Sequence, residues 1–114
     1  MRTERPGGLK LLRGAPAALA LVCAAASAQT VNEVVIRDYR FEPAEVQARV
    51  GGTVRWTNDE KRTSHSVIFP AEGGLESVRM FPGDSWERRF DKPGRYEYRC
   101  GPHPEMKGMV VVVE

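Results

Sequence analysis

One short stretch near the C-terminus gathers three side chains that bind soft metal ions. A thiol, an imidazole and a thioether follow at three-residue intervals in Cys100, His103 and Met106. The only other histidine, His65, lies well upstream. A thiolate, two imidazoles and a thioether form the mixed ligand set that suits copper cycling between Cu(I) and Cu(II). The residue types therefore predict that these four side chains hold one copper ion.

Other chemistries fit these residues less well. Structural zinc usually has four strong Cys or His ligands, and only three are present near this stretch and upstream of it. Magnesium and calcium prefer oxygen ligands. Cys100 and His103 would also suit a nucleophile with its base, but no third residue that would orient the histidine is evident. We therefore do not expect an enzyme. Taken singly, each of these residues also has a structural explanation, so the prediction depends on their joint arrangement.

The first 28 residues have the layout of a secretory signal peptide. A basic start precedes an apolar run over residues 15–26, and Ala26-Ser27-Ala28 supplies a cleavage pattern. The apolar run is about twelve residues long, whereas spanning a bilayer takes about 20. We therefore expect residues 1–28 to be removed on export to the periplasm, leaving a domain of residues 29–114 with no stable membrane insertion. A retained anchor and lipidation of Cys23 are the lesser alternatives, and the branched Val22 disfavours the second.

Removing this segment changes the charge and the cysteine count. The whole chain has 17 basic and 15 acidic residues, and four of the basic and one of the acidic residues fall in residues 1–28. The remaining domain is close to neutral, with no basic patch for nucleic acid. Cys100 is then the only cysteine, so no internal disulfide can form. A lone thiol in an oxidising compartment is at risk of oxidation unless a ligand occupies it, which favours a metal site over an inert buried cysteine.

From Gln29 onward apolar residues recur with period two, interrupted by glycine and proline, which predicts an all-β fold. The expected strands are residues 31–37, 45–50, 53–58, 65–69, 85–90, 95–100 and 109–114. We expect residues 39–43 to bend away from the first strand, and residues 71–80 to form a loop with at most one short strand or helical turn. Seven to eight short strands at hairpin spacing indicate a Greek-key β-sandwich or barrel.

This pattern also indicates how the ligands would be positioned. Cys100 ends a strand whose inward face carries Tyr96 and Tyr98. A short loop that contains two prolines would return His103 and Met106 towards the sulfur, and the prolines lower the entropy lost in fixing that loop. His65 must come from a different strand, so the site would depend on the folded sandwich.

The motifs resemble those of the plastocyanin/azurin family of blue (type 1) copper proteins, the cupredoxins. The resemblance rests on Tyr98-x-Cys100-x-x-His103-x-x-Met106-x-Gly108 and on motifs at residues 41–43, 52–58, 65–67 and 93–96, so that it covers nearly all of residues 31–113. The short ligand loop is similar to that of amicyanins. The resemblance implies that His65, Cys100 and His103 are equatorial ligands and that Met106 is axial. It also implies a single-electron carrier that works with redox partners such as c-type cytochromes or a periplasmic dehydrogenase.

Two residues depart from the family pattern. Gly101 stands where members often have Ser or Thr, and Ser66 stands where they often have Asn. The hydrogen bond between the two ligand segments is therefore expected to be weaker or to be made by the backbone, which leaves the redox potential open. We expect a monomer in which His103, between two prolines, is the port for electrons. A periplasmic copper carrier or resistance protein of the same fold remains the alternative.

Overall fold

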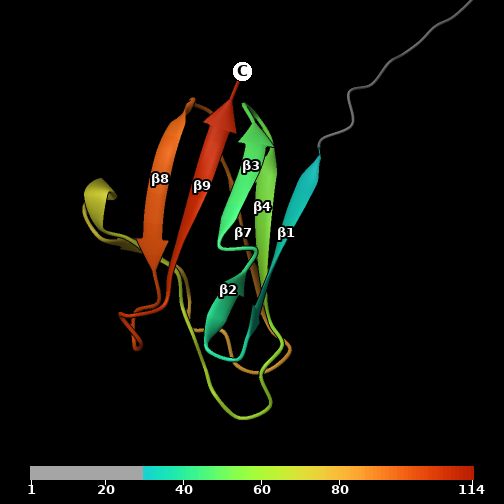
Figure 1. Ribbon diagram of the computed structural model, residues 1–114, viewed down its shortest axis with the longest axis vertical. Helices are drawn as coiled ribbons and strands as arrows, with labels where there is room; N and C mark the ends of the chain where they lie inside the picture. Colours follow the sequence, from blue (N-terminus) through green and yellow to red (C-terminus); the bar gives the residue numbers. More distant parts are fainter. Residues whose placement is uncertain (1–29) are drawn as a thin grey trace, which may run out of the picture.

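This computed structural model describes residues 30–114. They form two β-sheets packed face to face, and buried and exposed side chains alternate along most strands (Figure 1). The strands are β1 (Val31–Arg37), β2 (Arg40–Glu42), β3 (Glu45–Arg49), β4 (Thr53–Asn58), β5 (Ile68–Phe69), β6 (Leu75–Glu76), β7 (Ser85–Arg89), β8 (Gly94–Arg99) and β9 (Lys107–Val113). A short 3-10 turn, η1 (Pro70–Glu72), follows β5. The expected signal peptide, residues 1–28, lies outside the described residues. Within that described part, no helix has the length and apolar character needed to cross a membrane.

The strands of the two sheets are interleaved along the chain. One sheet has the order β2-β1-β4-β7, and the other has the order β3-β9-β8-β5-β6. The pairs β1–β4 and β3–β9 are parallel, so the chain passes from sheet to sheet rather than only through hairpins. The predicted all-β sandwich is confirmed. Residues 30–114 form nine strands instead of seven to eight, because the short strands β2 and β6 lie in segments that were expected to be a bend and a loop.

Two local expectations were wrong. The segment after β1 does not simply bend away, because β2 folds back on β1 and pairs Phe41 with Ile36. The expected strand at residues 65–69 is reduced to Ile68–Phe69, and His65 makes only an isolated bridge to Met80. Both errors have one cause, since periodicity reports which face is buried but not which backbone groups find a partner.

The core between the sheets is rich in aromatic side chains. The largest fully buried ones include Trp56, Phe69, Phe90 and Tyr98. Tyr98 meets Trp56 edge-on with ring centroids 5.3 Å apart, and it meets Phe41 at 4.8 Å. Such edge-to-face pairs stabilise beyond their buried area by about 0.5–1.5 kcal/mol. This packing fixes the strand that leads directly to Cys100.

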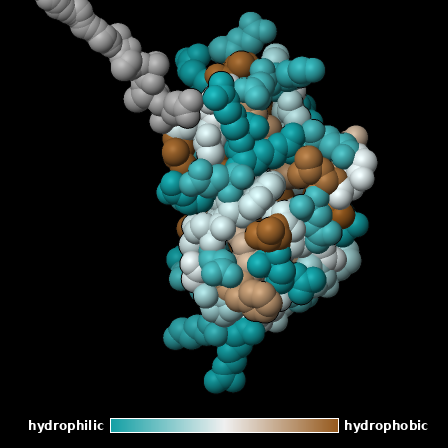
Figure 2. All heavy atoms as spheres, turned by 180° about the vertical axis from the view of Figure 1, so that it is seen from behind, coloured by the Kyte–Doolittle hydropathy of each residue, from teal (hydrophilic) through white to brown (hydrophobic). Residues whose placement is uncertain are grey.

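The loops that carry the predicted ligands lie at one end of the sandwich. In Figure 1 the loop between β8 and β9 and the long loop after β4 both lie at the end away from the C-terminus. On the face shown in Figure 2, hydrophobic side chains form small separate groups among hydrophilic ones. Such scattered groups are ordinary for a protein surface.

Candidate metal centre

Cys100 lies immediately after β8 and is fully buried. Its Sγ is 3.5 Å from His65 Nδ1 and 3.6 Å from His103 Nδ1. The structure thus brings together three of the four predicted residues, although they come from two separate segments. Their donor atoms all lie within 4.8 Å of one another.

The backbone holds His65 in place. Its N–H donates to the carbonyl of Met80 at 3.0 Å, and its carbonyl accepts from Met80 N–H at 2.8 Å. The loop before it is organised by buried Asn58, whose side-chain amide donates to the carbonyls of Thr63 and Met80 at 2.8 and 2.9 Å. Asn58 Oδ1 also accepts from Glu60 N–H at 2.9 Å. This fully buried amide binds three backbone groups, so it holds the loop that leads to His65 in one conformation.

The loop that joins β8 to β9 closes on itself through backbone hydrogen bonds. Cys100 N–H donates to the carbonyl of Met106, and Met106 N–H donates to the carbonyl of His103, both at 2.9 Å. Met106 is 3% exposed, whereas its neighbours Glu105 and Lys107 are exposed. The methionine side chain is therefore turned into the protein, at the same end as the other three residues.

Burial controls the charge state of His65. Loss of solvent lowers the pKa of its imidazole, the nearby His103 lowers it further, and Glu60 acts in the opposite direction. Glu60 Oε1 lies 3.6 Å from His65 Nε2, which is longer than a formed hydrogen bond. With Nδ1 facing the sulfur and Nε2 facing a carboxylate, the tautomer protonated at Nε2 would leave Nδ1 free to bind a metal.

The donor set fits a soft metal ion. A metal with bonds of about 2.0 Å to nitrogen and 2.3 Å to sulfur, at near-tetrahedral angles, separates those atoms by about 3.5 Å. The two measured sulfur–nitrogen distances agree with this value. Cys100 Sγ contacts no hydrogen-bonding group of the described residues other than these two imidazoles. The three donors therefore face one another around a common point, as ligands of a shared ion do.

Sequence reasoning missed Tyr39, which covers the two imidazoles. Its ring meets His103 edge-on at a centroid distance of 5.0 Å and His65 at 5.5 Å, and its hydroxyl lies 3.0 Å from Thr63 Oγ1. Tyr39 and Asp38 both have positive φ, 56° and 55°, in the turn between β1 and β2. This conformation is uncommon for a bulky residue, and strained residues of this kind cluster at functional sites.

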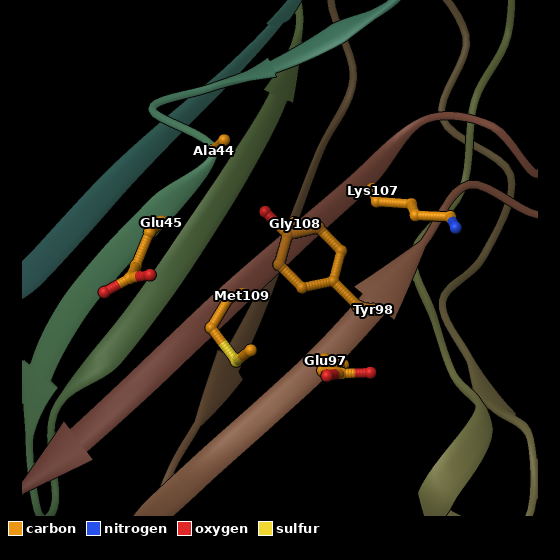
Figure 3. A pocket seen from close by; sticks show the side chains of 7 residues that line it. All are labelled: Ala44, Glu45, Glu97, Tyr98, Lys107, Gly108 and Met109. Atoms are coloured by element: carbon orange, nitrogen blue, oxygen red, sulfur yellow. The ribbon is translucent and has the colours of Figure 1, made fainter.

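A surface hollow lies elsewhere on the molecule. Figure 3 shows it over β3, β8 and β9, lined by Ala44, Glu45, Glu97, Tyr98, Lys107, Gly108 and Met109. None of the four predicted metal ligands lines it. The four predicted ligands lie at the end of the sandwich instead, where His65, Cys100 and Met106 are buried and His103 is half-buried.

Comparison with known proteins agrees with this fold and donor set. The chain matches the family model described as the cupredoxin-like domain over residues 12–112. Over 85 residues it is 39% identical to amicyanin-alpha of Methylorubrum extorquens, covering 71% of each protein. Over 94 residues it is 34% identical to amicyanin of Paracoccus denitrificans, covering 76% of this chain and 71% of that protein.

A solved structure agrees as well. The Cu(I) form of an amicyanin variant aligns with a TM-score of 0.70 at 36% identity, covering 75% of this chain and 85% of that one. A cluster of two histidines, a cysteine and a methionine in this fold is typical of a type 1 copper site. The chain belongs to the cupredoxin-like domain family.

Proposed function

We propose that this protein is a blue-copper electron carrier in which His65, Cys100 and His103 are the strong ligands and Met106 is the weak axial ligand. The observation that carries the proposal is the convergence of the three donor atoms within 4.8 Å from two segments of the fold. Bound copper would supply one-electron exchange between Cu(I) and Cu(II).

The chain's own residues would keep that site rigid and dry. His65 and Cys100 have no exposed surface, so water is kept from both donors. Buried Asn58 and the paired backbone of His65 and Met80 hold one side, and the self-bonded 100–106 loop holds the other. A donor set fixed in this way changes little when the charge of the ion changes, and a small rearrangement favours fast electron transfer.

His103 is the proposed port for electrons. It is half-buried, whereas Pro102 and Pro104 on either side are exposed, so one edge of the imidazole reaches the surface. We expect a monomer that docks briefly through this end to redox proteins such as c-type cytochromes or a periplasmic dehydrogenase. Small interfaces of this kind release quickly.

The proposed location is the bacterial periplasm. The basic start, the short apolar run and the cleavage pattern in residues 1–28 support export. The similarity to amicyanins of two bacteria is consistent with a bacterial protein. The lone Cys100 also suits an oxidising compartment if copper occupies it.

The alternative, a copper carrier of the same fold, is less well supported. A carrier must offer its ion to a partner's ligands by direct exchange, which requires open donor atoms. Here Cys100 and His65 are fully buried, and Tyr39 lies edge-on against both imidazoles. This burial supports a site that keeps its ion through both oxidation states.

A spectrum tests the proposal directly. Cu(II) added to the purified domain of residues 29–114 is expected to give an intense visible thiolate-to-copper band that Cys100→Ser abolishes. Reduction and reoxidation should remove and restore the band without loss of copper to a chelator. A colourless protein whose Cys100 thiol still reacts fully with a thiol reagent would contradict the copper site. Copper that leaves on every reduction would instead favour the carrier.

A further inference from the structure

The hydroxyl of Ser66 joins the two segments that carry the candidate ligands, and a carboxylate from a third element supports that hydroxyl. Gly101 N–H, directly after Cys100, donates to Ser66 Oγ at 3.1 Å, and Ser66 directly follows His65. Ser66 Oγ in turn donates to Glu76 Oε2 at 2.7 Å. The two hydrogen bonds thus run from the cysteine segment through the histidine segment to a carboxylate on β6.

The glycine at position 101 makes room for this arrangement. A Cβ added to Gly101 would overlap both Glu76 Oε2 and Ser66 Oγ. Related proteins often place a hydroxyl-bearing residue after the cysteine, and any side chain there would displace this carboxylate. The missing side chain and the carboxylate are therefore two parts of one arrangement, in which the hydroxyl comes from Ser66 instead.

The position of Glu76 is fixed by its strand. The short strand β6 pairs with β5 and places Glu76 opposite Ile68. The next residue, Ser77, donates its N–H to the carbonyl of Val67 at 2.8 Å and accepts from Val67 N–H through Oγ at 3.0 Å. Strand pairing at Glu76 and the two hydrogen bonds between Ser77 and Val67 thus hold the carboxylate against the hydroxyl, although Glu76 itself is exposed.

The chemistry of the two Ser66 hydrogen bonds favours a stable link, called here the tie, between Gly101, Ser66 and Glu76. Ser66 is 1% exposed, so its hydroxyl cannot turn to solvent for a partner. Hydrogen bonds from a hydroxyl to a carboxylate are short and roughly twice as strong as neutral ones. A hydroxyl that donates to an anion also becomes a better acceptor for a second donor, here Gly101 N–H.

We propose that Glu76 is a positioning residue for the metal centre: through Ser66 it ties Gly101 to the His65 segment and so holds Cys100 and His65 at their metal-binding separation. This inference rests on the proposed function for its meaning, but the tie is a property of the metal-free chain. In this protein Ser66 supplies the hydroxyl expected at position 101, and Glu76 holds that hydroxyl in place.

The first test uses the apoprotein. Amide hydrogen exchange of Gly101, followed by NMR, is expected to be at least about tenfold faster in Glu76→Ala and in Ser66→Ala than in the unmodified chain. Glu76→Gln keeps an acceptor oxygen in the same place and should restore most of the protection. Glu97→Ala is the matched control, because it removes an exposed carboxylate from β8 that has no ion pair among residues 30–114. An exchange rate in Glu76→Ala equal to that of the control would overturn the proposal.

The second test uses the copper-loaded protein. Loss of copper to a chelator should be severalfold faster in Glu76→Ala, near normal in Glu76→Gln and unchanged in Glu97→Ala. The thiolate-to-copper band should shift in Glu76→Ala alone. If the unmodified chain binds no copper, the proposed function fails, and the exchange experiment still decides whether the tie exists. If copper binds and Glu76→Ala releases it at the control rate with an unshifted band, the positioning role is wrong.

Discussion

Tyr98 and Gly108 show how one missing side chain shapes the core beside the metal centre. The two residues are opposite each other on β8 and β9, and a Cβ on Gly108 would overlap the end of the Tyr98 ring. Tyr98 is 2% exposed, and burial raises the pKa of its hydroxyl far above the ordinary value. The ring therefore fills space that any other residue at position 108 would occupy, two residues before the cysteine.

Gly108→Ala is expected to destabilise the apoprotein by about 1–3 kcal/mol, the usual effect of forcing extra volume into a packed core. Urea unfolding of the metal-free chain measures this free energy. The effect should be much smaller in a Tyr98→Leu background, where the end of the ring is absent, so a double-mutant cycle isolates the contact. Equal destabilisation in both backgrounds would show that Tyr98 is not the cause.

The candidate ligands could be predicted from sequence because their chemistry is local. Cys100, His103 and Met106 lie on one loop at a regular spacing, and His65 is the only remaining imidazole. The surrounding residues could not be predicted in this way. Tyr39 reaches the site from the turn before β2 and Glu76 from β6, and no spacing in the chain relates either residue to a cysteine after β8.

At the scale of the element, strand β7 places a charged residue on its inward face. Periodicity predicts Arg88 beside Trp86 and Phe90, and it also indicates that the guanidinium needs an exit. The structure supplies the exit as Glu72 in η1, which accepts two hydrogen bonds from Arg88 at 2.7 and 2.8 Å. The guanidinium carbon also lies 4.5 Å from the ring centres of Phe69 and Phe90. The partner could not be foreseen because residues 71–80 have no periodicity.

This ion pair predicts a pH dependence of stability. The hydrogen bonds and charge of Arg88 lower the pKa of Glu72 below its ordinary value of 4.5. A carboxylate with a lowered folded-state pKa stabilises the fold above its unfolded pKa, and that contribution is lost as the pH falls through the folded value. Glu72→Gln should therefore reduce the free energy of unfolding at pH 7 by about 0.2–1 kcal/mol, the range of partly exposed pairs.

Denaturant titrations at several pH values check this. The free energies of unfolding of Glu72→Gln and of the unmodified chain should approach each other steadily below pH 4.5, because the carboxylate of the unmodified chain also becomes neutral there. Glu97→Gln, which removes a charge on β8 without removing an ion pair of the described residues, should show little difference at any pH. A Glu72→Gln difference that stays constant from pH 7 to pH 3 would contradict the role of this charge.

At the scale of the whole molecule, the metal centre connects the two sheets. His65 lies on the segment that leaves β4 of the four-stranded sheet for β5 of the other sheet, whereas Cys100, His103 and Met106 lie between β8 and β9 of the five-stranded sheet. Ion binding therefore requires both sheets to be in place. An ion that binds only the folded state stabilises it by about 4 kcal/mol when present at a thousand times its dissociation constant.

Protonation of His65 opposes folding of the apoprotein. Burial lowers the folded-state pKa of His65 below 6.5, so the unfolded chain binds a proton there more readily than the folded chain does. The free energy of unfolding of the apoprotein should therefore fall as the pH drops below about 6.5, with a slope for this group of at most about 1.4 kcal/mol per pH unit. Urea titrations between pH 7.5 and pH 5 measure this slope. His65→Gln should flatten it, because the replacement cannot take up a proton, while Glu72 titrates only at lower pH.

The copper-loaded protein should be more stable than the apoprotein throughout, and its advantage should shrink as protons displace the ion from the imidazoles. An apoprotein whose stability is the same at pH 7.5 and pH 5 would show that His65 is not held neutral by burial.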